Sequence, residues 1–204
     1  LWTVVYLGSL LGGAFGTLEA IAPGFSRTIG YLFVSPEQRL EMVRNEQRQR
    51  LERLNRTLAQ DPNKVDAYLE RAALRQMLHD RQGAMADYDQ ILRLQPDNVQ
   101  ARSSRANYRE SIKDYTGAIA DYTALLNQNS DLPWTYVRRA SIYYQLKNYR
   151  KAYADVNQAI RHDRSSAMAF ELRSRIRKAL GDKKGAIADE KTTQALHKQM
   201  DEEP

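Results

Sequence analysis

Residues 65–204 repeat one pattern of small, aromatic and charged positions every 34 residues, without insertions. Inside each unit, the apolar positions follow the period of two short helices separated by a tight turn. A single hairpin of this kind leaves an apolar face uncovered, so we expect neighbouring units to stack and bury it. The period is marked most clearly by Ala84, Ala118, Ala152 and Ala186, and by Asp87, Asp121, Asp155 and Asp189.

The first unit carries the fullest form of the motif: Tyr68 is followed by Ala72, Ala84, Tyr88 and Pro96. A large aromatic residue, a small residue four positions later, and then alanine, an aromatic residue and proline at these offsets resemble the tetratricopeptide-repeat (TPR) family. The resemblance implies an all-α fold, a right-handed superhelical solenoid of four helix-turn-helix repeats. We expect these repeats at residues 65–98, 99–132, 133–166 and 167–204, the last of them including a C-terminal capping helix.

Some positions depart from the family pattern. Arg102 replaces the first aromatic residue of the second unit, and Ser130 and Arg164 replace the closing proline of the second and third. In the last unit, Glu190 and Thr193 stand where large apolar residues would otherwise be buried. A terminal repeat has no following neighbour, so these two residues predict a polar outer face.

An arginine precedes each periodic aspartate by sixteen residues, which places the two on different helices of one hairpin. We expect each arginine and aspartate to pair within the hairpin, with two parallel hydrogen bonds where the geometry allows; the alternative is that both are exposed and merely periodic. Pairing would neutralise much of the positive charge, which is +6 overall. The four arginines are Arg71, Arg105, Arg139 and Arg173.

The front of the chain differs sharply in composition from the repeats. Residues 1–36 carry only two charged side chains, Glu19 and Arg27, and the first 18 residues carry none. An apolar stretch of this length predicts an N-terminal transmembrane or membrane-associated helix, with residues 1–34 as anchor and interfacial segment. A signal-like segment, for which residues 20–22 would supply a small-residue cleavage site, or a segment buried in protein, is the alternative.

Gly8, Gly12 and Gly16 are spaced four residues apart in this segment, which favours a face for close helix packing in lipid. Glycine is also simply commoner in membrane helices than in soluble ones, so the spacing has a second explanation.

A helix start is predicted at Ser35, which precedes proline and lies three residues before Gln38. We expect residues 35–61 to form a connecting and capping helix that covers the first repeat and is supported by the i,i+4 pairs Glu46/Arg50 and Glu52/Arg56. Arg44, Arg48 and Arg53 have no obvious partner in this helix and leave contact with anionic lipid open.

The sequence offers no catalytic set. It has no cysteine, and its three histidines are far apart, so no thiol nucleophile or cysteine-ligated metal site can form. A glycine-rich phosphate loop is also missing. We therefore expect no enzyme, no metal and no cofactor.

The family resemblance implies that the leading helix of each repeat lines a groove for a peptide or a partner helix. It does not favour a chaperone-tail clamp, because Leu69 and Ala73 stand where such members carry lysine and asparagine. The partner-binding residues that it implies are Asn107, Trp134, Arg138, Ser141, Tyr144, Arg175 and Lys178, with Gln100, Ser103 and Val137 beside them.

The leading hypothesis is a protein-protein interaction scaffold that is held in a membrane by residues 1–34 and acts in assembly or stabilisation of a membrane protein complex. It resembles N-terminally anchored TPR proteins such as thylakoid assembly factors and organellar import receptors. Its partners would be protein subunits and the lipid bilayer, with the solenoid in the aqueous phase of a thylakoid or another bacterial or organellar membrane. The alternatives are a constitutive accessory subunit of a membrane complex, for example a photosynthetic one, and a basic surface for nucleic acid or anionic lipid; nucleic acid is the less favoured partner.

Overall fold

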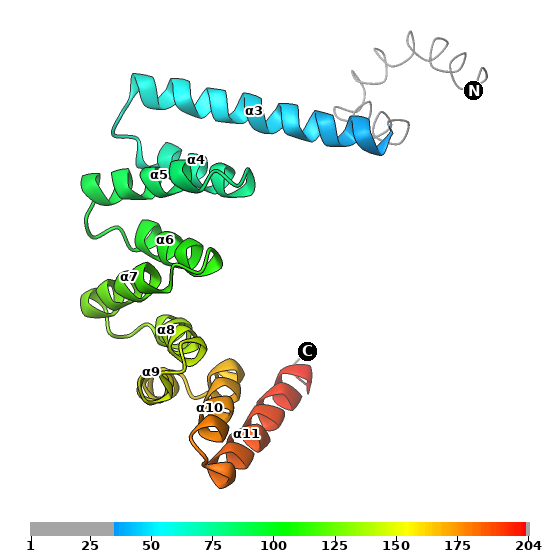
Figure 1. Ribbon diagram of the computed structural model, residues 1–204, viewed down its shortest axis with the longest axis vertical. Coiled ribbons are helices and arrows are strands. Elements are labelled where there is room, and N and C mark those ends of the chain that lie inside the picture. The colour runs from blue at the N-terminus through cyan, green and yellow to red at the C-terminus, as the bar shows by residue number, and fades with distance from the viewer. Residues whose placement is uncertain (1–34, 203–204) are drawn as a thin grey trace, which may run out of the picture. The chain divides into compact units, whose positions relative to one another are not determined.

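The computed structural model describes residues 35–202, and this part of the chain is all helix and turn (Figure 1). The chain as a whole divides into two compact units, Leu1–Arg56 and Thr57–Pro204. Among the helices of residues 35–202, none combines the length and the apolarity that crossing a bilayer requires. The predicted anchor, residues 1–34 with Gly8, Gly12 and Gly16, lies outside the described residues. The helices are α3 (Pro36–Gln60), α4 (Val65–Met77), α5 (Arg81–Leu94), α6 (Val99–Ser111), α7 (Tyr115–Gln128), α8 (Pro133–Gln145), α9 (Tyr149–His162), α10 (Ala167–Ala179) and α11 (Lys183–Glu202).

Helix α3 begins with the predicted capping box. The backbone N–H of Ser35 donates to Oε1 of Gln38 at 3.0 Å, and the N–H of Gln38 donates to Oγ of Ser35 at 3.2 Å. Each side chain thereby satisfies a donor that has no partner inside the helix. The predicted pair of Glu52 and Arg56 is also present, with 3.6 Å between the charged atoms.

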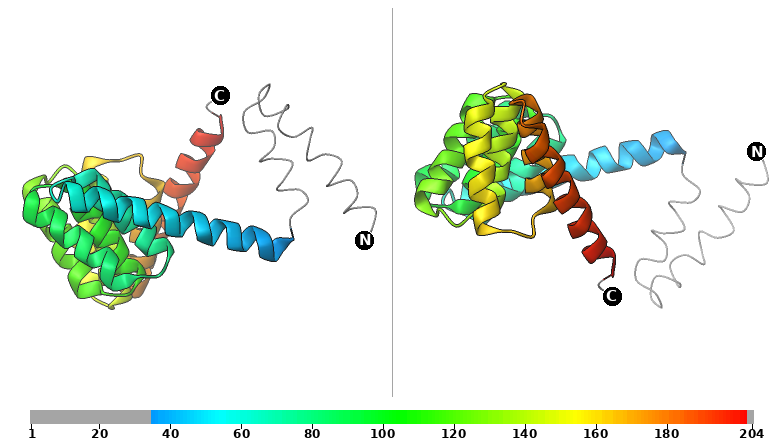
Figure 2. Two further views of the ribbon diagram at one scale, coloured as in Figure 1. Left: turned by 90° about the horizontal axis from the view of Figure 1, so that it is seen from above. Right: turned by 90° about the horizontal axis from the view of Figure 1, so that it is seen from below.

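Each predicted repeat contains one helical hairpin, and the four hairpins follow one another in a stack. Within the hairpins, α4 packs on α5, α6 on α7, α8 on α9 and α10 on α11, and each second helix packs on the first helix of the next pair. Figure 1 places the leading helices α6 and α8 on one side of the stack and α7 and α9 on the other. Figure 2 shows α10 and α11 side by side at its end.

The small residues of the motif lie where helices approach one another most closely. Ala72, Ala84, Ala106 and Ala118 are fully buried. The stacking prediction is confirmed by the core of the third repeat, which joins Val137 of α8 and Val156 of α9 to Ile176 of the following repeat. The apolar face of one hairpin is thus covered by the next.

The turn inside each hairpin places one residue in the left-handed region of backbone conformation. In the last repeat this residue is Gly181, with a φ of 86°, and in the others it carries a side chain. The second helix of the hairpin begins two residues after this left-handed residue. The residue between the two positions is an aspartate or asparagine, and it caps the second helix. The left-handed residues of the first three repeats are His79, Lys113 and Lys147, with φ values of 59°, 64° and 58°.

The outer face of the last helix differs from the prediction at one position. Thr193 is buried, and its hydroxyl donates to the backbone carbonyl of Asp189 at 3.0 Å. Because this bond satisfies the hydroxyl inside the helix, threonine is tolerated at a buried position. Ile187 is about half exposed on the same helix, so its surface is not uniformly polar.

Candidate functional site

The periodic arginines and aspartates form a buried ion-pair framework, as the sequence predicts. In the third repeat, Nε and Nη2 of Arg139 donate to the two carboxylate oxygens of Asp155 at 2.7 and 2.8 Å. In the second repeat, Nε and Nη2 of Arg105 donate to Asp121 at 3.0 and 2.6 Å. The same pairing holds Arg71 on Asp87 and Arg173 on Asp189.

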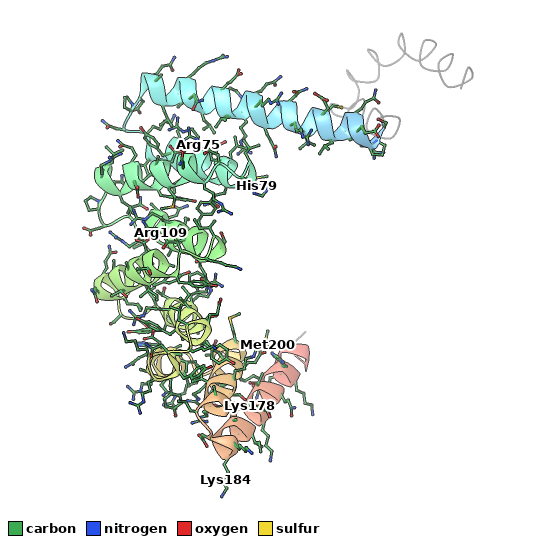
Figure 3. All side chains as sticks on the ribbon, viewed as in Figure 1. Arg75, His79, Arg109, Lys178, Lys184 and Met200 are labelled. Carbon is green, nitrogen blue, oxygen red and sulfur yellow. The ribbon has the colours of Figure 1, made fainter. Side chains whose placement is uncertain are left out.

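A second arginine, which we did not anticipate, binds the same carboxylate in three of the four repeats. Arg109 donates through Nη1 to Asp121 at 2.8 Å and to the backbone carbonyl of Gly117 at 3.2 Å. Arg75 occupies the corresponding place on α4 (Figure 3) and bonds Asp87 and Gly83 in the same way. Arg109 follows Arg75 by one 34-residue period and Arg177 follows Arg109 by two, which marks these positions as equivalent without naming their target.

The first set of arginines also connects successive repeats. Nη1 of Arg105 lies 2.5 Å from Asp89, and Nη1 of Arg139 lies 2.9 Å from Thr123, which in both cases belongs to the second helix of the preceding repeat. Arg173 makes the equivalent contact with Asn157 at 3.0 Å. A planar guanidinium that bonds in three directions fixes the angle between hairpins. Its donors are then used within the protein and are not available to a phosphate backbone.

Three of the predicted partner-binding residues meet in a network around the buried phenol of Tyr122. The Tyr122 hydroxyl lies 2.6 Å from Oδ1 of Asn107 and 3.0 Å from Oε2 of Glu110. Arg138 reaches the same Glu110 oxygen at 2.8 Å. The indole of Trp134 meets the Tyr122 ring edge-on at 6.4 Å and lies 5.5 Å from the Arg138 guanidinium.

This network has electrostatic consequences. The pKa of Tyr122 is raised to about 12, mainly by burial; the Glu110 carboxylate contributes to the rise, and the Arg138 guanidinium opposes it. Asn107 therefore already bonds Tyr122 within the second repeat, and Arg138 bonds Glu110 across the boundary between the second and third repeats. Trp134 keeps 47% of its surface exposed and remains open to a partner.

One groove lies between the leading helices α8 and α10. It is a pocket of about 130 Å³, and it continues into a second pocket of about 250 Å³ between α10 and α11, because Glu171 and Arg175 line both. Ser141 and Lys178, which the sequence assigned to the groove, each line one of the pockets. The first pocket is lined by Val137, Arg138, Ser141, Met168, Glu171, Leu172 and Arg175.

Arg175 and Lys178, two cations that the sequence assigned to the groove, are paired within the protein. Arg175 bonds Glu171 one helical turn away, and Nζ of Lys178 lies 2.5 Å from Glu190. The Lys178 hydrogen bond lowers the pKa of Glu190, and the hydroxyl of Ser174 contributes to the same shift. The groove thus presents compensated charge instead of a cationic clamp.

Tyr144 and Met168 change the set of residues that the sequence assigned to the groove. Tyr144 does not line the groove, because its ring packs against that of Tyr149 at 5.5 Å on the side of α9. Met168 was missed: it lines the groove and is 60% exposed. The repeat register could have identified Met168, because it stands 34 residues after Trp134, which the sequence assigned to the groove. Across residues 35–202, no group of three or more acidic or histidine side chains could hold a metal ion.

Comparisons with known proteins agree with the repeat pattern. The family model described as a tetratricopeptide repeat matches residues 135–165, within the third unit. The chain is similar in structure to MamA, at 13% identity and a TM-score of 0.71, with 84% of this chain and 99% of that chain covered. MamA from Desulfovibrio magneticus RS-1, from residue 41 to its end, matches at 18% identity and a TM-score of 0.69, over 78% of this chain and 90% of that one.

A third structure, YrrB, described as a TPR protein with an unusual peptide-binding site, is 13% identical with a TM-score of 0.63, over 78% of this chain and 81% of that chain. None of the curated proteins matches the sequence. At these identities the likeness concerns the fold. Residues 57–202 accordingly form an all-helical, TPR-like solenoid.

Proposed function

We propose that the protein is a non-catalytic interaction scaffold whose leading helices bind a segment of a partner protein. The observation that carries the proposal is the continuous groove across α8, α10 and α11, with Met168 exposed beside it. Trp134 and Met168 occupy the same register position near the start of α8 and α10. Large exposed side chains of these types, flanked by polar groups, are common at the centre of protein interfaces.

The groove chemistry favours a partner segment with an apolar anchor. Its acidic and basic side chains already pair with each other, as Glu171 does with Arg175 and Glu190 with Lys178. A uniformly acidic tail would have to break these pairs before binding. A segment that places an apolar side chain against Met168 and Leu172 would leave the pairs intact and remove apolar surface from water.

We also propose that residues 1–34 hold the scaffold at a membrane as a single-pass anchor, with the repeats in the aqueous phase of a bacterial or organellar membrane such as a thylakoid. Support comes from the composition: only two of the first 36 residues are charged. In this setting the scaffold would serve assembly or stabilisation of a membrane protein complex, and Gly8, Gly12 and Gly16 would pack on a partner's helix.

The binding proposal is tested by Met168→Glu in the full-length chain, followed by native gel electrophoresis of detergent-extracted membranes. We expect the wild-type protein to migrate with a larger complex and the variant to run free, because a carboxylate cannot be buried against an apolar anchor. Met77→Glu is the matched control, since Met77 on α4 is 65% exposed and does not line this groove. Equal migration of the two variants would refute the groove as the binding site.

The anchor is tested separately by Gly12→Leu, which should weaken incorporation into the complex without changing the melting temperature of the repeats. Unchanged co-purification would remove the argument from the glycine face. The same gels distinguish a transient factor, most of which migrates free, from a permanent accessory subunit, most of which migrates with its complex.

A further inference from the structure

The turns inside the third and fourth hairpins form a surface that the groove does not explain. We call it the turn edge and define it as residues 146–151 and 180–185. Leu180 of the fourth turn lines one open depression with five consecutive residues of the third turn. The two turns are therefore contiguous on the surface. The residues of the third turn in the depression are Leu146, Lys147, Asn148, Tyr149 and Arg150.

The positive charge of the turns is confined to this end of the stack. The turn at residues 146–151 has three basic residues and no acidic one, and residues 180–185 have two basic residues and one acidic. The equivalent turns at 78–83 and 112–117 each have one basic and one acidic residue. Because all four turns have the same backbone shape, the fold itself does not require the charge of the turn edge.

Four of the five basic residues of the turn edge are directed to solvent, and the fifth, Lys151, lies over the ring of Tyr143. Within the described part of the chain, Lys147, Arg150, Lys183 and Lys184 are exposed and form no ion pair. Lys184 extends from the turn at the end of the stack (Figure 3). The single acidic residue, Asp182, is occupied elsewhere: it accepts the N–H of Gly185 at 2.8 Å and lies 3.5 Å from Arg177.

Exposed leucines accompany these charges. Leu146 is 49% exposed and Leu180 is 46% exposed. An apolar side chain between lysines is typical of surfaces that rest on a bilayer, where the apolar group enters the interface and the lysine stems reach the headgroups. Each basic residue near an anionic leaflet adds attraction.

We propose that the turn edge binds an anionic lipid surface, so that the third and fourth repeats lie against a membrane. The observations favour lipid over nucleic acid, because exposed leucines such as Leu146 and Leu180 do not contribute to the binding of phosphate groups. Nucleic-acid surfaces also rely on free aromatic faces for stacking, whereas Tyr149 packs against Tyr144. The contact does not depend on residues 1–34, although an anchor there would strengthen it by raising the local concentration of lipid.

The test uses the absence of cysteine from the chain. Leu146→Cys in the full-length protein carries a spin label, and its mobility and oxygen accessibility are measured with phosphatidylcholine vesicles that contain or lack phosphatidylserine. Leu78→Cys, at the same register position in the first repeat, is the matched control. We expect immobilisation and increased oxygen accessibility at position 146 only, only with phosphatidylserine, and reversed by salt. Flotation with the vesicles that lack phosphatidylserine reports separately on residues 1–34, because the turn edge should not bind them, so the two membrane proposals can fail independently.

A charge variant then tests the cause. Adding Lys147→Gln and Arg150→Gln to the labelled protein should lower the ratio of docked to undocked label about fivefold per charge removed. The same result at positions 146 and 78, or no dependence on phosphatidylserine, would overturn the proposal. A response of the label to single-stranded RNA but not to vesicles would overturn it in favour of nucleic acid.

Discussion

The ammonium group of Lys151 lies over the ring of Tyr143, with Nζ 5.5 Å from the ring centroid. In the other three repeats these two positions are glycine and arginine, as in Gly117 and Arg109. A Cβ atom added at Gly117 would stand 2.8 Å from Cδ of Arg109, which is closer than non-bonded carbon atoms allow. The third repeat has therefore exchanged both residues together, and a cation–π contact replaces the second arginine of the framework.

This relationship predicts strong coupling between the two positions. Gly117→Lys should lower the free energy of unfolding by about 2–3 kcal/mol, because Arg109 must leave Asp121 to make room. Tyr143→Arg should also destabilise, since Lys151 occupies the space that the arginine needs, and Tyr143→Arg with Lys151→Gly should recover the loss. Urea denaturation of the wild-type protein, the two single variants at positions 143 and 151 and the double variant completes a double-mutant cycle. We expect it to give an interaction energy between the two positions above about 1 kcal/mol. Additive effects would show that the two exchanges are independent.

The buried carboxylates should dominate the stability of the hairpins. The Asp121 side chain is 3% exposed and balances both Arg105 and Arg109. Asp121→Asn should lower the free energy of unfolding by about 3 kcal/mol, because two largely buried guanidinium groups lose their counter-charge. Asp89→Asn is the control: Asp89 also bonds Arg105, but its side chain is 48% exposed, so a loss of at most about 1 kcal/mol is expected. Chemical denaturation measures both, and equal losses would contradict the framework.

The ion-pair framework was predictable from the sequence only in part. The fixed 34-residue period was enough to predict the hairpins and the pairing of Arg105 with Asp121, because an uninterrupted period forces equivalent residues into equivalent places. The period also contained Arg109, but its target could not be read from spacing, since it bonds a backbone carbonyl as well as a carboxylate.

The site was predictable only in part, for a physical reason. Register places a residue on the groove side of a leading helix, but it does not say which neighbour the side chain bonds. Arg138 faces the groove and pairs with Glu110. Tyr144 turns toward Tyr149. Such choices depend on side-chain conformations and on contacts between repeats that the sequence pattern does not encode.

The raised pKa of Tyr122 predicts a loss of stability at alkaline pH. Between its ordinary value of 10.0 and about 12, the unfolded chain has released the phenolic proton and the folded chain still holds it. The free energy of unfolding should therefore fall as pH rises through this window, by about 2 kcal/mol. Tyr122→Phe should cost about 1 kcal/mol at neutral pH through the lost hydrogen bond and should show a smaller alkaline loss. Parallel curves of stability against pH for the two proteins would contradict this assignment.

Substitutions at two left-handed turn residues should change the free energy of unfolding in opposite directions. Lys113 has a φ of 64°, so Lys113→Gly should raise the free energy of unfolding by about 0.5–1 kcal/mol. Gly181 has a φ of 86°, and a Cβ atom there would meet no atom within 4 Å. Gly181→Ala should therefore destabilise by about 1 kcal/mol through backbone strain alone. Thermal denaturation compares the variants, and a shift of the same sign in both would be inconsistent with the turn geometry.

We propose above all that the groove of the leading helices holds a partner protein at a membrane. This proposal is tested most directly by replacing Met168 with a photo-crosslinking amino acid in the full-length chain and irradiating native membranes. The prediction is a discrete crosslinked product from position 168 that is missing when the same amino acid replaces Met77, which is equally exposed on α4. Identical crosslinking patterns from the two positions, or none from either, would contradict the claim.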